Sequence, residues 1–409
     1  MTLLSYSIMS LTSIKYISYG DTTGYGLSGL AYLRGLLNLG FSVYWRPVFW
    51  GSHGLQFWSP EMGANVLEAV RASQGDPSLR DLQAIMQLTT APKDYDIVIS
   101  HIVPEYLPSC FEEGKTNFAY CAWESDTIPA HWPAILNKFH AVLVPSQFNA
   151  DVFRAGGVTV PIHVVPHIRR HAHEDITPEQ RSDMRRQLGI DEDRFVFYSI
   201  GAWMLRKDFP RLIEAFLQEF GEDEPVALLL KTSSKPVHFP LPHEQGKTSL
   251  QLVQESIQAF ASKHQRSRAT IALLAGDGVS GAWLDCLHQV GDAYISLSRA
   301  EGWGMGAFEA TVLGRPVLMT GWSGQLDFLG HDHPGLIDYS LEPIDWPGTS
   351  YGPDHRWAVA DIDDTRRKMR ELFERRNQPD EHAMRLSEKM CSQYSEAVIM
   401  RQYRAIIGA

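Results

Sequence analysis

The chain has 409 residues, of which 44% are hydrophobic and 21% are charged, and this balance predicts a soluble protein of two or three domains with full cores. Acidic residues outnumber basic ones by 48 to 37, giving a net charge of −11, which argues against nucleic-acid binding because phosphate contacts need a positive surface. The four cysteines form no Cys-x-x-Cys pair, as expected for a cytoplasmic protein without a disulfide framework.

The first residues of the chain do not have the pattern of a secretory signal. Residues 1–19 contain Lys15 as their only charge and no small-residue cleavage site, so a secretory signal is not expected. Either Met1 or Met9 could be the natural start. No window is long and apolar enough for a transmembrane segment, which leaves peripheral contact with a membrane as the closest association expected.

Short apolar runs alternate with helical patterns through the first half of the chain, as in parallel βαβ units. Buried strands are predicted at residues 13–19, 42–45, 96–100, 117–121, 141–144 and 162–165. A helix is predicted over residues 27–39, with Gly40 just after its end. Ser146 is suited to the N-cap of another helix.

A glycine motif opens the first of these helices. It reads Gly24-Tyr25-Gly26-Leu27-Ser28-Gly29, a Gly-x-Gly-x-x-Gly pattern that lets backbone N–H groups approach a phosphate. An NAD site also needs an acidic residue about twenty positions later, and none occurs between Asp21 and Glu61. Arg46, predicted at the end of the second strand, could hold the 2′-phosphate of NADP, so an NADP-dependent oxidoreductase stays open, as does a tight turn with only a packing role.

The alternation of short apolar runs with helical patterns is interrupted between residues 167 and 193. Polar residues there precede Thr177-Pro178-Glu179-Gln180, a capping box with proline at the first helical position. Residues 1–170 are therefore taken as an N-terminal domain, 171–193 as a linker with a short helix, and 194–385 as a C-terminal domain. The helices of residues 386–409 are expected to pack back toward the N-terminal domain.

The C-terminal domain repeats the alternation. Strands are predicted at residues 195–200, 226–231, 270–275, 293–297 and 316–320, and helices at 210–220, 249–263, 282–290 and 306–313. The fold class is therefore α/β, with two Rossmann-like domains whose parallel sheets face one another across a cleft. In such folds ligands bind at the carboxyl ends of the strands.

Residues 292–317 are the most informative segment for function. A strand ends near Ser298, a glycine-rich turn follows, and a helix begins at Gly304 or Gly306, so that free N–H groups and the positive helix end point into the cleft, where a diphosphate can bind. Glu309, expected in the first turn of this helix, can accept hydrogen bonds from two ribose hydroxyls. Glu301 lies before the helix, closer to a transferred sugar.

The segment Glu301-Gly-Trp-Gly-Met-Gly-Ala-Phe-Glu309 resembles the Glu-x₇-Glu signature of the retaining glycosyltransferases of family four (glycosyl transferases group 1), which have the GT-B fold. Residues 292–324 are similar to the donor-binding half of that family, and residues 144–153 and 164–167 to the closing strands of its first domain. The resemblance implies that a sugar moves, with retention of configuration, from a UDP- or GDP-linked donor to a hydroxyl of a glycan, small molecule or protein, without a metal or other cofactor.

Site residues follow from the same resemblance. The donor would be bound by Glu309, Gly302, Trp303, Gly304, Met305 and Gly306, together with Gly24 and Gly26 of the N-terminal domain. Arg206 and Lys207 match the basic pair of the family and, with Glu301, would be catalytic, since cations beside a departing diphosphate stabilise its charge. The family's usual arginine after the strand glycine is replaced by Ala202, which Arg206 could compensate.

The N-terminal domain also departs from the family, which often has a histidine at the end of a central strand. Residues 118–126 contain none. Trp123, Glu124 and Asp126 follow a predicted strand and should line the acceptor side of the cleft, and His101 is a further candidate there. A GT-B epimerase remains an enzymatic alternative.

One acidic motif matches a metal signature by its letters. Asp361-Ile-Asp363-Asp364 has the Asp-x-Asp pattern of other glycosyltransferases, but it precedes a predicted helix, where an N-cap explains it more simply. No metal site is predicted.

Overall fold

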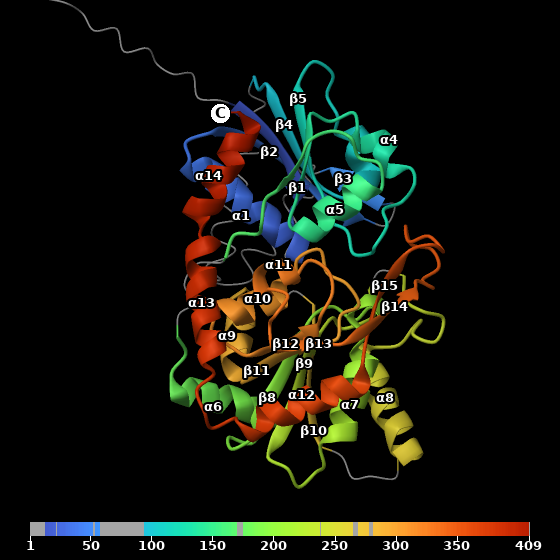
Figure 1. Cartoon of the computed structure of the whole chain (residues 1–409), viewed down its shortest axis with the longest axis vertical. Coiled ribbons are helices and arrows are strands. Elements are labelled where there is room, and N and C mark those ends of the chain that lie inside the picture. Colours follow the sequence, from blue (N-terminus) through green and yellow to red (C-terminus); the bar gives the residue numbers. More distant parts are fainter. Residues whose placement is uncertain are drawn as a thin grey trace, which may run out of the picture.

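The computed structural model describes residues 13–21, 23–51, 54–57, 94–169, 175–237, 239–264, 269–277 and 281–408. Met1, Met9 and residues 171–174 of the predicted linker lie outside the described residues. Two sheets, each with helices around it, lie one above the other in Figure 1, and the chain passes from the first sheet to the second through α6 (Pro178–Gln187).

The first sheet has seven strands in the order β3-β2-β1-β4-β5-β6-β7. They are β1 (Ser13–Tyr19), β2 (Ser42–Gly51), β3 (Gly54–Phe57), β4 (Ile97–His101), β5 (Thr116–Tyr120), β6 (Ala141–Val144) and β7 (Ile162–Val164). All neighbours are parallel except β2 and β3. Its helices are α1 (Gly24–Asn38), η2 (Pro104–Ser109), α4 (Trp132–Leu136) and α5 (Gln147–Ala155).

The predicted end of the second strand is wrong. β2 continues to Gly51 because Val48 to Gly51 pair antiparallel with β3. Arg46 therefore lies inside the strand, where its guanidinium is 5.8 Å from the centre of the Phe57 ring and donates to the hydroxyl of Tyr44 at 3.3 Å. It is not at the strand end that an NADP site requires.

The second sheet is parallel throughout, in the order β10-β9-β8-β11-β12-β13. Its strands are β8 (Phe195–Ile200), β9 (Val226–Thr232), β10 (Thr270–Ala275), β11 (Ala293–Ser296), β12 (Val317–Thr320) and β13 (Leu336–Ile337). The helices that follow them are α7 (Phe209–Glu219), α8 (Ser249–His264), α9 (Gly281–Val290), α10 (Met305–Val312), α11 (Leu326–Leu329) and α12 (Ile362–Glu374). A separate antiparallel hairpin joins β14 (Tyr339–Pro343) to β15 (Arg356–Ala360).

Several predicted caps are confirmed. Thr177 and Gln180 form the reciprocal capping box of α6, Ser146 accepts a hydrogen bond from the backbone of α5, and Asp361 does the same at the start of α12. These side chains satisfy N–H groups that the first turn leaves without helical partners. The Asp361 motif is thus a helix cap.

The last two helices, α13 (Glu381–Gln393) and α14 (Glu396–Ile407), run along one side of the molecule from the second sheet to the first (Figure 1). Met400 of α14 fits against Gly35 of α1, where a Cβ would come within 2.5 Å of it, and Asn38 donates to Glu396 at 2.6 Å. None of the helices in the described part of the chain is long and apolar enough to cross a membrane.

Candidate functional site

Three charged side chains meet beyond the carboxyl ends of β8 and β11. The short helix η3 (Leu205–Lys207) follows β8 and carries Arg206 and Lys207, whereas Glu301 follows β11. Nη1 of Arg206 lies 3.0 Å from Oε2 of Glu301, Nζ of Lys207 contacts Oε1, and Ser298 donates to Oε1 at 2.6 Å. The structure therefore brings the three predicted catalytic residues into one group, the basic–acidic cluster.

Backbone and side-chain contacts join the loop after β8 to the loop after β11. The N–H of Arg299 donates to the carbonyl of Arg206 at 2.8 Å, and the Arg206 guanidinium donates to the carbonyl of Ala300 at 2.5 Å. Asp208 ends η3 in the left-handed conformation, with φ of 49°, and its carboxylate pairs with Arg299 at 2.8 Å. Arg206 is thus held by contacts with both loops, whereas the ammonium group of Lys207 is held by Glu301.

Burial and charge set the protonation of the cluster. Burial alone raises the pKa of Glu301, but the charges of Lys207 and Arg206 outweigh it and hold that pKa at about 2. Burial lowers the pKa of Arg206, whereas Glu124 and Glu301 raise it above its usual range. For Lys207 burial prevails over Glu301, and its pKa is lowered. Glu301 is therefore ionised at neutral pH.

The low pKa of Glu301 predicts an acid-dependent contribution to stability. An ordinary glutamate has a pKa of about 4.3, so the folded protein binds a proton at Glu301 less tightly than the unfolded chain does. At pH values above about 4.3, ionised Glu301 therefore stabilises the folded state by about 3 kcal/mol. This contribution is lost as the pH falls toward about 2. We expect the difference in melting temperature between wild type and Glu301→Gln to narrow between pH 5 and pH 3, measured by thermal melting.

The matched control is Glu371→Gln, because Glu371 lies on α12 with 57% of its side chain exposed. The difference in melting temperature between Glu371→Gln and wild type should stay small across the same pH range. If the difference in melting temperature between wild type and Glu301→Gln stayed constant from pH 5 to pH 3, the lowered pKa of Glu301 would be contradicted.

The helix after the cluster begins at Met305, within the predicted range. Its N-cap, Gly304, has φ of 95°, a left-handed conformation that favours glycine. Because the helix begins there, Glu309 lies in its second turn, and its predicted place in the first turn is wrong. Glu309 is 1% exposed and lies close enough to His167 to act on its pKa, which burial lowers to about 3 against the opposing charge of Glu309.

The glycine motif of the N-terminal domain faces this helix start. A Cβ on Gly24 would lie 3.7 Å from Cγ of Met305, so the N-terminal ends of α1 and α10 approach one another across the domain interface. Thr23 caps α1 and accepts a hydrogen bond from the N–H of Gly26 at 3.2 Å. The N–H of Gly26 thus has a partner within the protein.

Other residues of the glycine-rich turn have structural contacts. Trp303 is 2% exposed, and its ring packs against Phe308, Phe328 and Tyr394 at centroid distances of 5.1 to 5.4 Å. Gly302 allows the turn to approach the N-terminal domain, because a Cβ there would lie 3.0 Å from that of Ala122. The indole of Trp303 therefore supports the turn from the core.

The N-terminal domain contributes to the cluster through Glu124. This residue follows β5, and its Oε1 lies 3.4 Å from Nη2 of Arg206. Tyr351 of the β14–β15 hairpin stacks on Trp123 with ring centroids 4.6 Å apart and donates to Oε2 of Glu124 at 3.3 Å. Asp126 pairs with Arg356 at 2.9 Å. The three predicted acceptor-side residues thus all meet the C-terminal domain.

No family model matches the sequence, and no relative is found among curated proteins. Solved structures match the fold along its whole length. HepE of Anabaena, in complex with UDP and glucose, has a TM-score of 0.62 at 15% identity over 97% of this chain and 99% of its own. A glycosyltransferase of Rickettsia africae has 0.63 at 13% identity over 97% and 98%. Sucrose-phosphate synthase of Thermosynechococcus elongatus has 0.61 at 14% identity over 97% and 99%.

The chain has the GT-B fold. Its two Rossmann-like domains carry parallel sheets, apart from the antiparallel edge strand β3, as the sequence predicted. In this GT-B chain, His101 at the end of β4 is fully buried; its Nδ1 lies 3.0 Å from the hydroxyl of Tyr16, and its ring centroid is 4.1 Å from that of Tyr120. Burial lowers its pKa well below the usual range, which keeps the imidazole neutral.

The hairpin loop is the part of the site that sequence reasoning missed. It runs from Ile344 to His355 between the two strands, and Trp346, Tyr351 and Trp357 pack together around it. Three aromatic residues within a polar, proline- and glycine-containing stretch were the available signal. Among the described residues, no group of three or more His, Cys, Asp or Glu side chains is placed to hold a metal ion.

Proposed function

We propose that this protein is a retaining glycosyltransferase of family four that moves a sugar from a UDP- or GDP-linked donor to a hydroxyl acceptor. The observation that carries the proposal is the basic–acidic cluster of Arg206, Lys207 and Glu301 beside the start of α10. The GT-B fold and neighbours solved with UDP or UDP-glucose support it. The net charge of −11 suits an acceptor outside the membrane.

Each part of the site has a role in this reaction. The N–H groups at the start of α10 and the positive helix end receive the diphosphate, and Arg206 and Lys207 stabilise the charge that develops on it as the sugar leaves. Glu309 accepts hydrogen bonds from the ribose hydroxyls, and Glu301 binds a hydroxyl of the sugar. The donor therefore lies against the C-terminal domain, with its diphosphate between the facing ends of α1 and α10.

The acceptor enters from the N-terminal domain, next to Trp123, Glu124 and Asp126. Its hydroxyl attacks the anomeric carbon on the face that the diphosphate leaves, and the departing phosphate oxygen takes the hydroxyl proton. The bond to the acceptor oxygen forms as the bond to the diphosphate breaks, so configuration is retained without a nucleophile from the protein. Arg46 lies within β2 against Phe57, a position that does not support the NADP-dependent alternative.

The hairpin loop gives a prediction for the acceptor side. Tyr351→Ala removes a stacked ring from Trp123 and the hydrogen bond to Glu124, losses worth together about 1 to 3 kcal/mol. We expect a lower melting temperature but an affinity for UDP within about twofold of wild type, because the stacking and hydrogen-bond contacts that this variant removes are with Trp123 and Glu124, on the proposed acceptor side. Thermal melting and calorimetric titration measure the two effects.

Tyr339→Ala is the control, since Tyr339 lies on β14 of the same hairpin with 41% of its surface exposed. It should leave both quantities unchanged. If Tyr351→Ala instead weakened UDP binding about tenfold, the hairpin would belong to the donor side of the site.

The proposal as a whole is tested by incubating the wild-type protein with UDP- and GDP-sugars and following release of the nucleotide. Slow hydrolysis without an acceptor is expected for the cognate donor, and added acceptors should accelerate it. Release of no nucleotide from any donor, with or without glycans and small hydroxyl compounds, would contradict the proposed activity.

A further inference from the structure

The carboxylate of Glu124 lies between the two domains. Glu124 follows β5 of the first sheet, and its Oε1 is 3.4 Å from Nη2 of Arg206, in the loop after β8. Its Oε2 accepts a hydrogen bond at 3.3 Å from the hydroxyl of Tyr351, in the β14–β15 hairpin. Both oxygens of Glu124 therefore contact residues of the other domain.

The backbone on either side of Glu124 is also held in place. Asn149 of α5 accepts a hydrogen bond from the N–H of Trp123 and donates one to its carbonyl, both at 2.9 Å. On the other side, the N–H of Asp126 donates to the carbonyl of Arg356 in the hairpin at 3.1 Å. The position of the Glu124 carboxylate is therefore set by contacts with both domains.

Arg206 contacts the two domains through different nitrogens. Its Nη1 donates to the carbonyl of Ala300 at 2.5 Å and lies 3.0 Å from Oε2 of Glu301, whereas its Nη2 faces Glu124. Because a guanidinium is planar, contacts at both terminal nitrogens fix its direction as well as its position. Without Glu124, the contacts at Nη1 would restrict the direction of the plane less.

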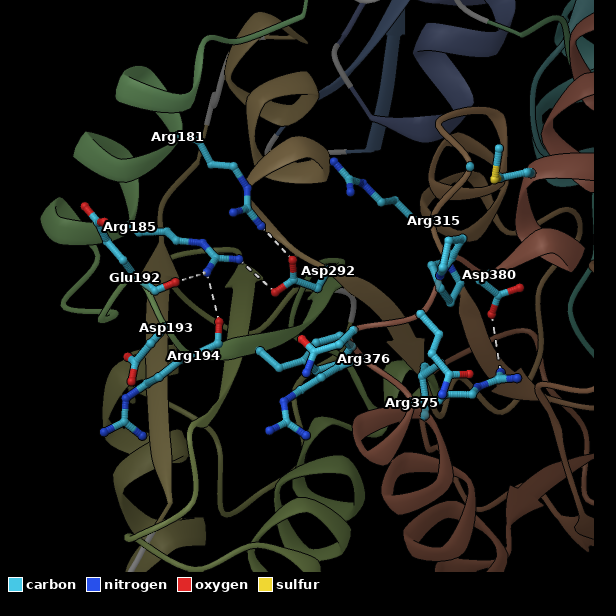
Figure 2. Close-up of a pocket in the computed structure, with 18 residues that line it drawn as sticks. Arg181, Arg185, Glu192, Asp193, Arg194, Asp292, Arg315, Arg375, Arg376 and Asp380 are labelled. Carbon is cyan, nitrogen blue, oxygen red and sulfur yellow. Dashed lines mark hydrogen bonds and ion pairs between the residues drawn. The ribbon is translucent and has the colours of Figure 1, made fainter.

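Ion pairs at the other end of the second sheet have a different arrangement. Figure 2 shows Arg181 and Arg185 of α6 both pointing at Asp292, which directly precedes β11. Their nitrogens lie 2.6 and 2.8 Å from its two oxygens, and these contacts involve no residue of the first sheet or its helices. The direction of the Arg206 guanidinium, in contrast, depends on the contact between the two domains.

Glu124 also changes the charge balance beside the basic–acidic cluster. Burial lowers the pKa of Arg206, and the negative charges of Glu124 and Glu301 both oppose this effect. With Glu124 included, the two cations Arg206 and Lys207 face two carboxylates. The charge of Glu124 repels a diphosphate, so it weakens the attraction that the two cations exert. Its contact with Arg206 therefore has to serve something other than donor affinity.

We propose that Glu124 is a positioning residue that directs the guanidinium of Arg206 toward the departing diphosphate. This role rests on the proposed function. A cation stabilises developing charge best when its direction is set before the reaction, and a misplacement of about 1 Å can cost about 100-fold in rate. Because Glu124 belongs to the domain that receives the acceptor, Arg206 is aligned when the two domains meet around both substrates.

Acceptor-free release of nucleotide from the cognate nucleotide sugar tests this role, with kcat and KM measured separately for the full chain. We expect Glu124→Gln to lower kcat by about 10- to 100-fold without raising KM, because glutamine keeps the size of the side chain but loses the charge that directs Arg206. Glu124→Asp keeps the carboxylate, so its kcat should lie between those of Glu124→Gln and wild type.

Two further measurements separate positioning from a merely structural role. In an Arg206→Ala background, Glu124→Gln should change kcat by less than about twofold, because the residue through which Glu124 acts is already absent. Calorimetric titration with inorganic pyrophosphate needs no turnover. Glu124→Gln should bind pyrophosphate about two- to fivefold more tightly than wild type, since a repelling charge is removed. A structural role predicts weaker binding instead.

The control is Glu113→Gln, which makes the same change of charge at an exposed residue before β5. Its kcat, KM and affinity for pyrophosphate should equal those of wild type. The positioning role would be overturned by a normal kcat in Glu124→Gln, by a loss that persists in full in the Arg206→Ala background, or by weaker binding of pyrophosphate. A loss confined to the acceptor-stimulated rate would make Glu124 an acceptor ligand and also overturn it.

These outcomes are distinct from a failure of the proposed function. In each of them the wild type still releases nucleotide from its donor, so the glycosyltransferase activity stands and only the role of Glu124 is wrong. Release of no nucleotide by the wild type would contradict the activity itself, and the positioning role with it.

Discussion

Lys207→Ala is expected to lower the turnover of the nucleotide sugar by about 10²- to 10³-fold. Lys207 and Arg206 are the two cations of the basic–acidic cluster, with only 19% and 12% of their side chains exposed. In such a poorly hydrated site a fixed charge stabilises a departing diphosphate more than it would in water. Initial rates of nucleotide release at saturating donor measure the loss.

The control for this variant is Lys263→Ala, because Lys263 lies on α8 with 68% of its side chain exposed. Its turnover should equal that of wild type. Lys207→Ala also removes a buried partner of Glu301, which can cost about 3 to 5 kcal/mol of stability, so rates are compared below the melting transition of the variant. Normal turnover in folded Lys207→Ala would contradict the role of the cluster.

Glu309→Gln is expected to weaken the affinity for UDP by about 10- to 100-fold. The carboxylate is buried on α10, and hydrogen bonds to a charged group contribute about 1.5 to 3 kcal/mol each. Glutamine keeps the size of the side chain but loses the charge and one acceptor oxygen. Calorimetric titration with UDP measures the effect.

A comparison of ligands makes this prediction specific. Inorganic pyrophosphate lacks the ribose, so its affinity should change little in Glu309→Gln. Glu388→Gln, an exposed position on α13, should bind both ligands as wild type does. Equal losses for UDP and pyrophosphate would place Glu309 at the diphosphate and contradict its assignment to the ribose.

Much of the fold could be predicted because its signals are local. The bounds of β1, β6, β8 and β10 agree with the apolar runs, and the capping box at Thr177 depends on residues three positions apart. The start of α10 followed from the glycines around it. Hydrophobic periodicity and cap chemistry involve residues only a few positions apart, so these features can be predicted without knowing the tertiary contacts.

The remaining features depend on contacts between distant parts of the chain. Glu124 and Tyr351 are 227 positions apart, and no local pattern indicates that they meet. The extension of β2 comes from pairing with β3. His101 followed the predicted strand, but its packing in an aromatic group depends on Tyr16 and Tyr120.

The most direct test of the proposed donor site is a thermal-shift panel of UDP, GDP and NADP⁺ with the wild-type protein. A ligand that binds only the folded state at 100 times its dissociation constant adds about 2.7 kcal/mol of stability. We predict that UDP or GDP raises the melting temperature and that NADP⁺ does not. A rise with NADP⁺ and none with either nucleoside diphosphate would contradict a nucleotide-sugar site at Glu301 and Glu309.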